Sequence, residues 1–88
     1  MAITSPANRS SVPRGTVTVQ TGVSRPAVVW KVAFYIDGRP RSQDYLTPFG
    51  YVWNTRSLVK GSTHTIKVIA YDLGGASLGQ ATATVTVR

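Results

Sequence analysis

The chain has 88 residues, which is enough for one domain with one hydrophobic core and too short for a second lobe around an active site. It contains no cysteine, which excludes disulfides and thiolate metal sites, and no apolar run approaches the roughly 20 residues of a membrane-spanning helix. Ten Lys and Arg residues stand against three acids, giving a net charge of +7 that favours encounters with polyanions or acidic surfaces.

Apolar and polar residues alternate along most of the chain, and no window of about 12 residues carries a helical stripe. β-Branched residues are abundant, as is typical of strands. In chain order we expect strands over 16–23, 30–36, 49–53, 64–71 and 81–87, separated by clusters of Gly, Pro, Asn and Ser. Strands at this spacing indicate an all-β fold, a sandwich or barrel of antiparallel strands.

The clearest turn signal is Asp37-Gly38, between the strand expected over 30–36 and the polar segment 39–45. Asp-Gly suits a two-residue hairpin turn with positive φ at both residues, so we expect 39–45 to return antiparallel to 30–36. Pro40 has no N–H to donate, which places this returning segment at the edge of a sheet.

The period of two also predicts the core. Five aromatic residues share inward parity, and we expect the core to contain Trp30, Phe34, Phe49, Tyr51 and Trp53. Trp53 and Phe34 should meet Val68 and Val85 from the facing strands.

The segments VAFYIDGRP, TPFGYVWNT, GSTHTIKVIAYD and ATATVTV, following ITSPANRSSV, resemble the bacterial immunoglobulin-like modules of secreted and cell-surface proteins. The likeness covers essentially the whole chain, and its strongest pieces are FY-x-DG, W-N-T and G-S-x-H-T. It implies an immunoglobulin-like antiparallel β-sandwich of about seven strands, with 1–88 as a single domain taken from a longer chain. It also implies an extracellular or cell-surface location, although the N-terminal residues lack the basic start and apolar stretch of a signal peptide.

Catalytic chemistry has few residues to use, since the chain has one His and neither Cys nor Glu. His64 shares the inward parity of Ile66, so we interpret it as a packed or capping residue. Asp44 and Asp72 fall in loops that the family's topology brings to one end, but calcium takes about six to eight oxygen ligands. We therefore expect no enzymatic activity, no metal site and no cofactor.

One candidate binding surface is an outward-facing pair of tyrosines. Tyr35 and Tyr71 lie on strands expected to be neighbours, with Lys31 and Lys67 on the same face. The arrangement fits either a flat platform for a polysaccharide or ordinary cross-strand packing on a solvated face.

The other candidate surface is a basic pole. In a sandwich of this type several loops and the C-terminus emerge at one end, with Asp44 and Asp72 at the other. The basic residues expected there are Arg14, Arg39, Arg41, Arg56, Lys60 and Arg88. They fit either a surface that meets an acidic partner or solvated residues that keep the domain soluble.

The leading hypothesis is a non-catalytic module that acts as a spacer, stabiliser or accessory domain in a bacterial extracellular or surface protein. The alternative is a carbohydrate- or polyanion-binding module. Expected partners are neighbouring domains of the same chain and, under the alternative, a polysaccharide or another polyanion. Nucleic acid and membrane insertion are not favoured, and the isolated domain is expected to be a monomer.

Overall fold

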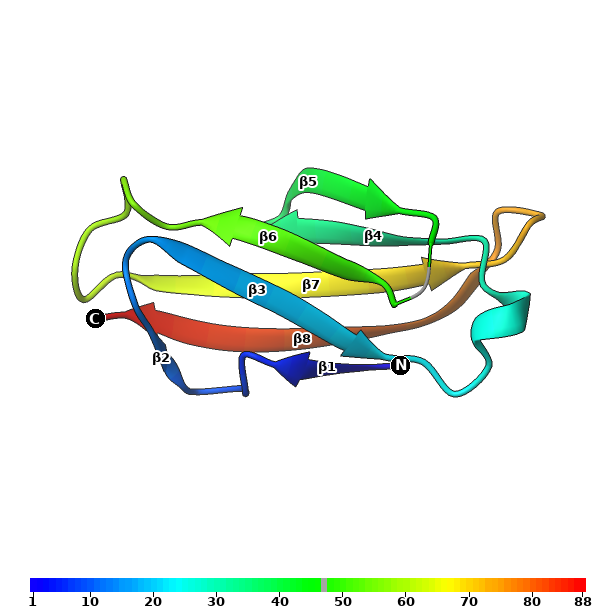
Figure 1. Ribbon diagram of the computed structural model, residues 1–88, viewed down its shortest axis with the longest axis horizontal. Helices are drawn as coiled ribbons and strands as arrows, with labels where there is room; N and C mark the ends of the chain where they lie inside the picture. Colours follow the sequence, from blue (N-terminus) through cyan, green and yellow to red (C-terminus); the bar gives the residue numbers. More distant parts are fainter. Residues whose placement is uncertain (47) are drawn as a thin grey trace.

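The computed structural model describes residues 1–46 and 48–88 as two β-sheets packed face to face (Figure 1). The smaller sheet has the order β1-β3-β6, formed by Ala2–Ser5, Thr16–Gly22 and Gly50–Asn54. The larger sheet has the order β2-β8-β7-β4-β5, formed by Ser11–Val12, Ser77–Val87, Thr63–Tyr71, Lys31–Ile36 and Arg39–Asp44. One 3-10 turn, η1 (Pro26–Val28), lies between β3 and β4. The predicted all-β sandwich is confirmed.

The described chain has eight strands rather than about seven because the N-terminal segment contributes to both sheets. β1 pairs antiparallel with β3, whereas β2 pairs in parallel with the end of β8, where Ser11 lies opposite Thr86. Pro6 lies between β1 and β2 and has no N–H for a ladder, so the first strand ends there and the chain crosses between sheets. Asn8 Oδ1 accepts the N–H of Thr84 (2.8 Å) and fastens the crossing segment to β8.

Side chains of both sheets fill one core. Trp53 is only 2% exposed and belongs to the same buried cluster as Phe34, Val68 and Val85, as the alternation predicts. Phe49 is buried as well, and Tyr51 packs against this cluster with its ring centroid 5.7 Å from that of Phe34.

The hairpin between β4 and β5 forms as its sequence predicts. Asp37 and Gly38 have φ values of +54° and +80°, the positive values that the tight turn requires. β5 pairs antiparallel with β4 and lies at the edge of the larger sheet, where the missing N–H of Pro40 costs no ladder bond.

The last loop is shorter than the Gly-rich segment 72–79 suggests, and β8 begins at Ser77 instead of 81. Asp72 closes the turn, because its N–H donates to the carbonyl of Ala76 (3.0 Å) and its Oδ1 accepts the N–H groups of Gly74 (2.9 Å) and Ala76 (3.0 Å). The chain therefore resumes pairing directly after Ala76.

The prediction that Trp30 lies in the core is wrong. β4 begins one residue later, at Lys31, and the side chain of Trp30 is 37% exposed. Alternation assigns faces only within a continuous strand, and η1 ends two residues before Trp30. Val29 packs against the core from this connection instead, which leaves the larger indole outside.

Candidate functional site

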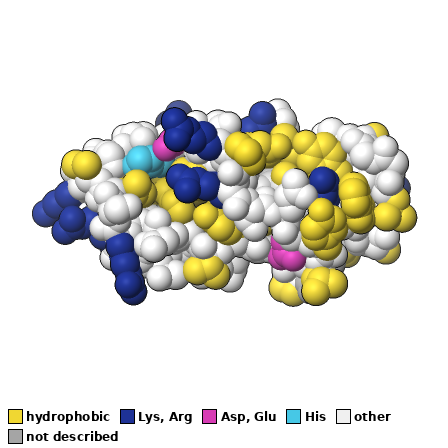
Figure 2. Space-filling view, turned by 90° about the horizontal axis from the view of Figure 1, so that it is seen from above, with side chains coloured by type: hydrophobic (Ala, Val, Ile, Leu, Met, Phe, Trp, Pro, Cys, Tyr) yellow, Lys and Arg dark blue, Asp and Glu magenta, His cyan; other side chains and the backbone are white. Residues whose placement is uncertain are grey.

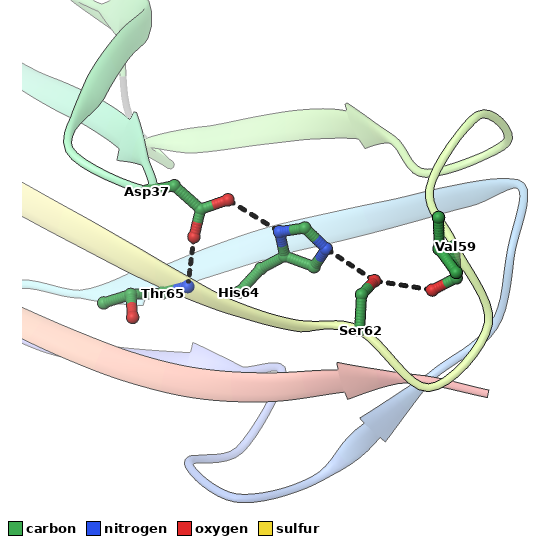
Figure 3. A network of polar contacts seen from close by, with 5 residues as sticks. All are labelled: Asp37, Val59, Ser62, His64 and Thr65. Atoms are coloured by element: carbon green, nitrogen blue, oxygen red, sulfur yellow. Dashed lines mark hydrogen bonds and ion pairs between the residues drawn. The ribbon is translucent and has the colours of Figure 1, made fainter.

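A closed polar network lies where the β4–β5 turn meets the start of β7 (Figure 3). His64 Nδ1 is 2.6 Å from Asp37 Oδ2, and His64 Nε2 is 2.8 Å from Ser62 Oγ. Asp37 Oδ1 also accepts the N–H of Thr65 (2.9 Å). We call Asp37, Ser62, His64 and Thr65 the His64 cluster. His64 is 14% exposed and packs edge-on against Trp53, with ring centroids 5.9 Å apart, so its interpretation as a packed residue is confirmed.

The surroundings of Asp37 favour its charged form. Burial raises the pKa of this carboxyl, but the hydrogen bonds from His64 and Thr65 and the electrostatic effects of His64 and Arg41 outweigh that effect. The net result is a pKa of Asp37 below its ordinary value of 3.8. An ionised Asp37 accepts two hydrogen bonds and holds the turn against β7.

Ser62, His64 and Asp37 follow the order of a catalytic triad, yet their contacts fit a structural role. Ser62 Oγ donates to the carbonyl of Val59 (2.5 Å), so its single proton is already used. The N–H groups of Ser62 and Gly61 donate to the carbonyls of Val59 (3.0 Å) and Val87 (2.6 Å), which leaves neither for an oxyanion. The absence of enzymatic activity stays a prediction.

Thr55 lies at the same end of the module and, like the His64 cluster, ties a loop to a strand by hydrogen bonds; we call both of them fasteners. Thr55 is fully buried, its Oγ1 donates to the carbonyl of Pro13 (2.8 Å), and the same oxygen accepts the N–H of Gly15 (2.8 Å). The N–H of Thr55 donates in turn to the carbonyl of Gly15 (2.8 Å). The turn before β3 is thereby tied to the end of β6, a long-range role of the W-N-T segment that the sequence alone did not predict.

An open cluster of aromatic and polar side chains lies on the outer side of the larger sheet. Lys31 Nζ lies 4.7 Å from the ring centroid of Trp30 and 5.5 Å from that of Tyr71, within cation–π range of both rings. Lys31 Nζ also donates to Gln43 Oε1 (3.2 Å), as does the hydroxyl of Tyr45 (2.8 Å). We call Trp30, Lys31, Gln43, Tyr45 and Tyr71 the Lys31 cluster.

The predicted tyrosine pair is partly reproduced. Tyr35 and Tyr71 lie on adjacent strands, but they are not opposite each other. Tyr35 is opposite Lys67 and Tyr71 is opposite Lys31, and the Ala33–Ile69 pair lies between these two pairs. Hydrogen bonding with the nearby Tyr35 hydroxyl raises the pKa of Tyr71. Ala33 is only 3% exposed despite its outward position, which indicates that its larger neighbours cover it. These contacts favour cross-strand packing for Tyr35, and a binding role for Tyr35 and Lys67 stays a prediction.

Sequence reasoning missed Trp30, Gln43 and Tyr45 as parts of an outer-face cluster. Tyr45 is not among the five aromatic residues with inward parity, which is a usable signal, whereas the parity of Trp30 indicates the wrong face. Gln43 gave no signal, because its role depends on the register that places it opposite Ala33.

The residues of the predicted basic pole lie in two separate groups. Backbone hydrogen bonds connect the β2–β3 turn, the β6–β7 connection and the C-terminus at one end of the module. This end carries Arg14, Arg56, Lys60 and Arg88, which we call the basic end. Arg39 and Arg41 lie on β5 instead. Arg39 pairs with Ile36 of β4, which lies across β7 from Ala83 of β8. Ala83 lies about 13 Å before Val87 along β8, at about 3.3 Å per residue.

Asp44 and Asp72 lie toward the opposite end, and each carboxylate is used within its own loop. Asp44 accepts the N–H groups of Leu46 (3.1 Å) and Gly50 (2.9 Å), much as Asp72 accepts those of its turn. Among the described residues, no three His, Cys, Asp or Glu side chains lie close enough to hold a metal ion.

Comparison with known proteins places the chain in a family. A family model of the bacterial Ig domain matches residues 1–68. Among solved structures, the fibronectin(III)-like modules of CbhA from Clostridium thermocellum match with a TM-score of 0.80 and 25% identity, over 99% of this chain and 94% of that chain. No curated protein matches. The described residues include no helix long and apolar enough to cross a membrane. Because the family model covers well over half of the sequence, the chain belongs to the bacterial Ig domain family.

Proposed function

We propose that the chain is a non-catalytic linking module of a bacterial extracellular or cell-surface protein. The observation that carries this proposal is its elongated shape, 40 × 19 × 19 Å, with Arg88 at one end and Met1 in the opposite half (Figure 1). A chain that passes through such a module continues roughly in line and holds the neighbouring domains apart. The similarity to the fibronectin(III)-like modules of CbhA supports an accessory role beside other domains.

The fasteners described above also support a linking role. The His64 cluster and Thr55 tie loops to strands at the end from which the chain leaves, and such ties limit bending at the exit. A linker that keeps its shape sets a defined distance between its neighbours.

Small-angle X-ray scattering of two directly joined copies tests this proposal. We expect a maximum dimension of about twice the 40 Å length of one copy. A control tandem with a flexible Gly-Ser linker should show a broader distribution of distances. A direct tandem that folds back to the dimension of one copy would contradict the linking role.

A second candidate function is polyanion binding at the basic end. It is favoured by the placement of Arg14, Arg56, Lys60 and Arg88 around the exit of the chain and by the net charge of +7. Heparin chromatography of variants that lose three positive charges at this end or elsewhere tests it.

A further inference from the structure

Exposed hydrophobic side chains are concentrated at the end opposite the basic end. Six of the eight large hydrophobic residues that are exposed in the described chain lie in or beside η1, the β5–β6 connection and the β7–β8 turn, namely Val28, Trp30, Tyr45, Leu46, Leu73 and Leu78. Figure 2 shows hydrophobic side chains gathered over this half, while several Lys and Arg side chains lie toward the other. Contiguous apolar surface on a small domain commonly marks a binding site.

The most ordered part of this surface is the Lys31 cluster. The rings of Trp30 and Tyr45 meet edge to face with centroids 5.5 Å apart, and Tyr45 is 49% exposed. Gln43 Oε1 accepts from both the Lys31 ammonium (3.2 Å) and the Tyr45 hydroxyl (2.8 Å) and so links the charge to the ring. Side chains held by one another lose little rotamer freedom on binding, which favours affinity.

A shallow groove of about 600 Å³ adjoins the cluster and is within the size range of small-ligand sites. Its lining includes Trp30 and Tyr45 together with Val28, Leu73 and Asp72. The groove thus combines aromatic and aliphatic walls with a few polar groups.

We propose that the Lys31 cluster and this groove bind a polysaccharide that contains uronic acid. A pyranose ring presents C–H groups on its faces and hydroxyls at its edge, so it suits an exposed indole or phenol face flanked by polar groups. Gln43 and Asp72 offer hydrogen-bond partners for the hydroxyls, and Lys31 offers a cation for the uronate carboxylate. This binding role is additional to the linking role and does not depend on it.

The arrangement favours an acidic glycan over a nucleic acid. The cluster contains a single cation, Lys31, whereas nucleic-acid affinity rests on several simultaneous phosphate contacts. The edge-to-face geometry of Trp30 and Tyr45 also leaves no parallel pair of rings between which a base can stack. Lys31 offers one cation to one carboxylate, while Oδ1 of the Asp72 carboxylate in the groove already accepts the N–H groups of Gly74 and Ala76.

Isothermal titration calorimetry with a hexamer of galacturonic acid tests the proposal on the intact 88-residue chain. Cellohexaose and a thymidine hexanucleotide serve as the neutral and the nucleic-acid ligands. We expect binding of the acidic hexamer, and we expect Trp30→Ala to weaken it about tenfold or more, as removal of a central aromatic contact does. Tyr45→Phe, which keeps the ring but breaks the bond to Gln43, should weaken it less.

A matched control removes two charges at the other end, Arg56→Ser with Lys60→Ser, and should leave the affinity within about threefold. Melting temperatures of all variants check the fold. The proposal is overturned if the parent does not bind the acidic hexamer, if the control loses as much affinity as Trp30→Ala, or if cellohexaose or the hexanucleotide binds as tightly as the acidic hexamer.

Discussion

Each end of this module holds an indole next to a basic side chain, but the indole is buried at one end and exposed at the other. At the end that holds the C-terminus, His64 lies against Trp53 with its ring nitrogens facing Asp37 and Ser62. At the other end, Lys31 lies over Trp30 with one hydrogen bond to Gln43, and the indole faces solvent. Both ring nitrogens of His64 therefore have hydrogen-bond partners within the protein, whereas the exposed part of Trp30 stays accessible to another molecule.

The difference follows from the position of each indole relative to its strand. Trp53 lies within β6, where alternation points it between the sheets, and Trp30 lies just before β4, outside regular pairing. The same residue type therefore stabilises the fold at one end and forms surface at the other. The same substitution should therefore change the free energy of unfolding by different amounts at the two ends.

The largest contrast is expected for the two indoles. Trp53→Ala removes a buried ring from the core and should cost roughly 3–5 kcal/mol of the free energy of unfolding, a large part of the about 5–15 kcal/mol of a small domain. Trp30→Ala should cost less than about 1 kcal/mol because the ring is partly solvated. Urea unfolding followed by circular dichroism measures both. Equal losses would show that the two ends do not differ as described.

Thr55 offers a test of the end that holds the C-terminus. Thr55→Val keeps the shape of the side chain but leaves the N–H of Gly15 and the carbonyl of Pro13 without their side-chain partner, and should cost about 1–3 kcal/mol. Thr18→Val, at an exposed position of β3, is the matched control and should change stability by less than about 0.5 kcal/mol. If Thr55→Val were as stable as this control, the hydrogen bonds of Thr55 would not stabilise this end of the module.

The pH dependence of stability tests the His64 cluster. The folded-state pKa of Asp37 is lowered, so its charged form stabilises the fold above the ordinary pKa of 3.8, and this contribution is lost as pH falls through the folded pKa. Asp37→Asn should therefore lower the melting temperature at about pH 6, and this difference should shrink as the pH falls below the unfolded pKa. The effect should be small because the side chain is half exposed and water screens it. A melting difference that is constant over this range would contradict the proposed charge.

The smallest effect is expected from removing the same number of charges at two different places. One variant replaces Arg14, Arg56 and Lys60 by Ser, and its control replaces Arg9, Arg25 and Lys67 by Ser, so both lose three charges. If the basic end meets polyanions, the first variant should elute from immobilised heparin at the lower salt concentration, because local charge density governs screened attraction. Elution of both at the same salt would reduce the effect to net charge.

Local patterns predicted much of the fold, whereas contacts between distant segments determined the clusters. Asp37-Gly38 and Pro40 predicted a turn and an edge strand because φ requirements and a missing N–H act on the residue itself. The bond between Asp37 and His64 joins residues 27 positions apart and depends on the register of β4 against β7, which alternation does not fix. Trp30 was misplaced for a related reason, since a turn interrupts the pattern that its parity assumes.

The parallel pairing of β2 with β8 has a mechanical consequence. Three backbone hydrogen bonds join this segment to β8, from Arg9 to Thr84 (2.6 Å), from Thr86 to Ser10 (3.0 Å) and from Arg88 to Val12 (2.9 Å). Tension that draws Met1 and Arg88 apart pulls the two parallel segments in opposite directions, so it loads these bonds together in shear instead of opening them one at a time. The shortest strand of the sandwich therefore resists stretching of the module along its length.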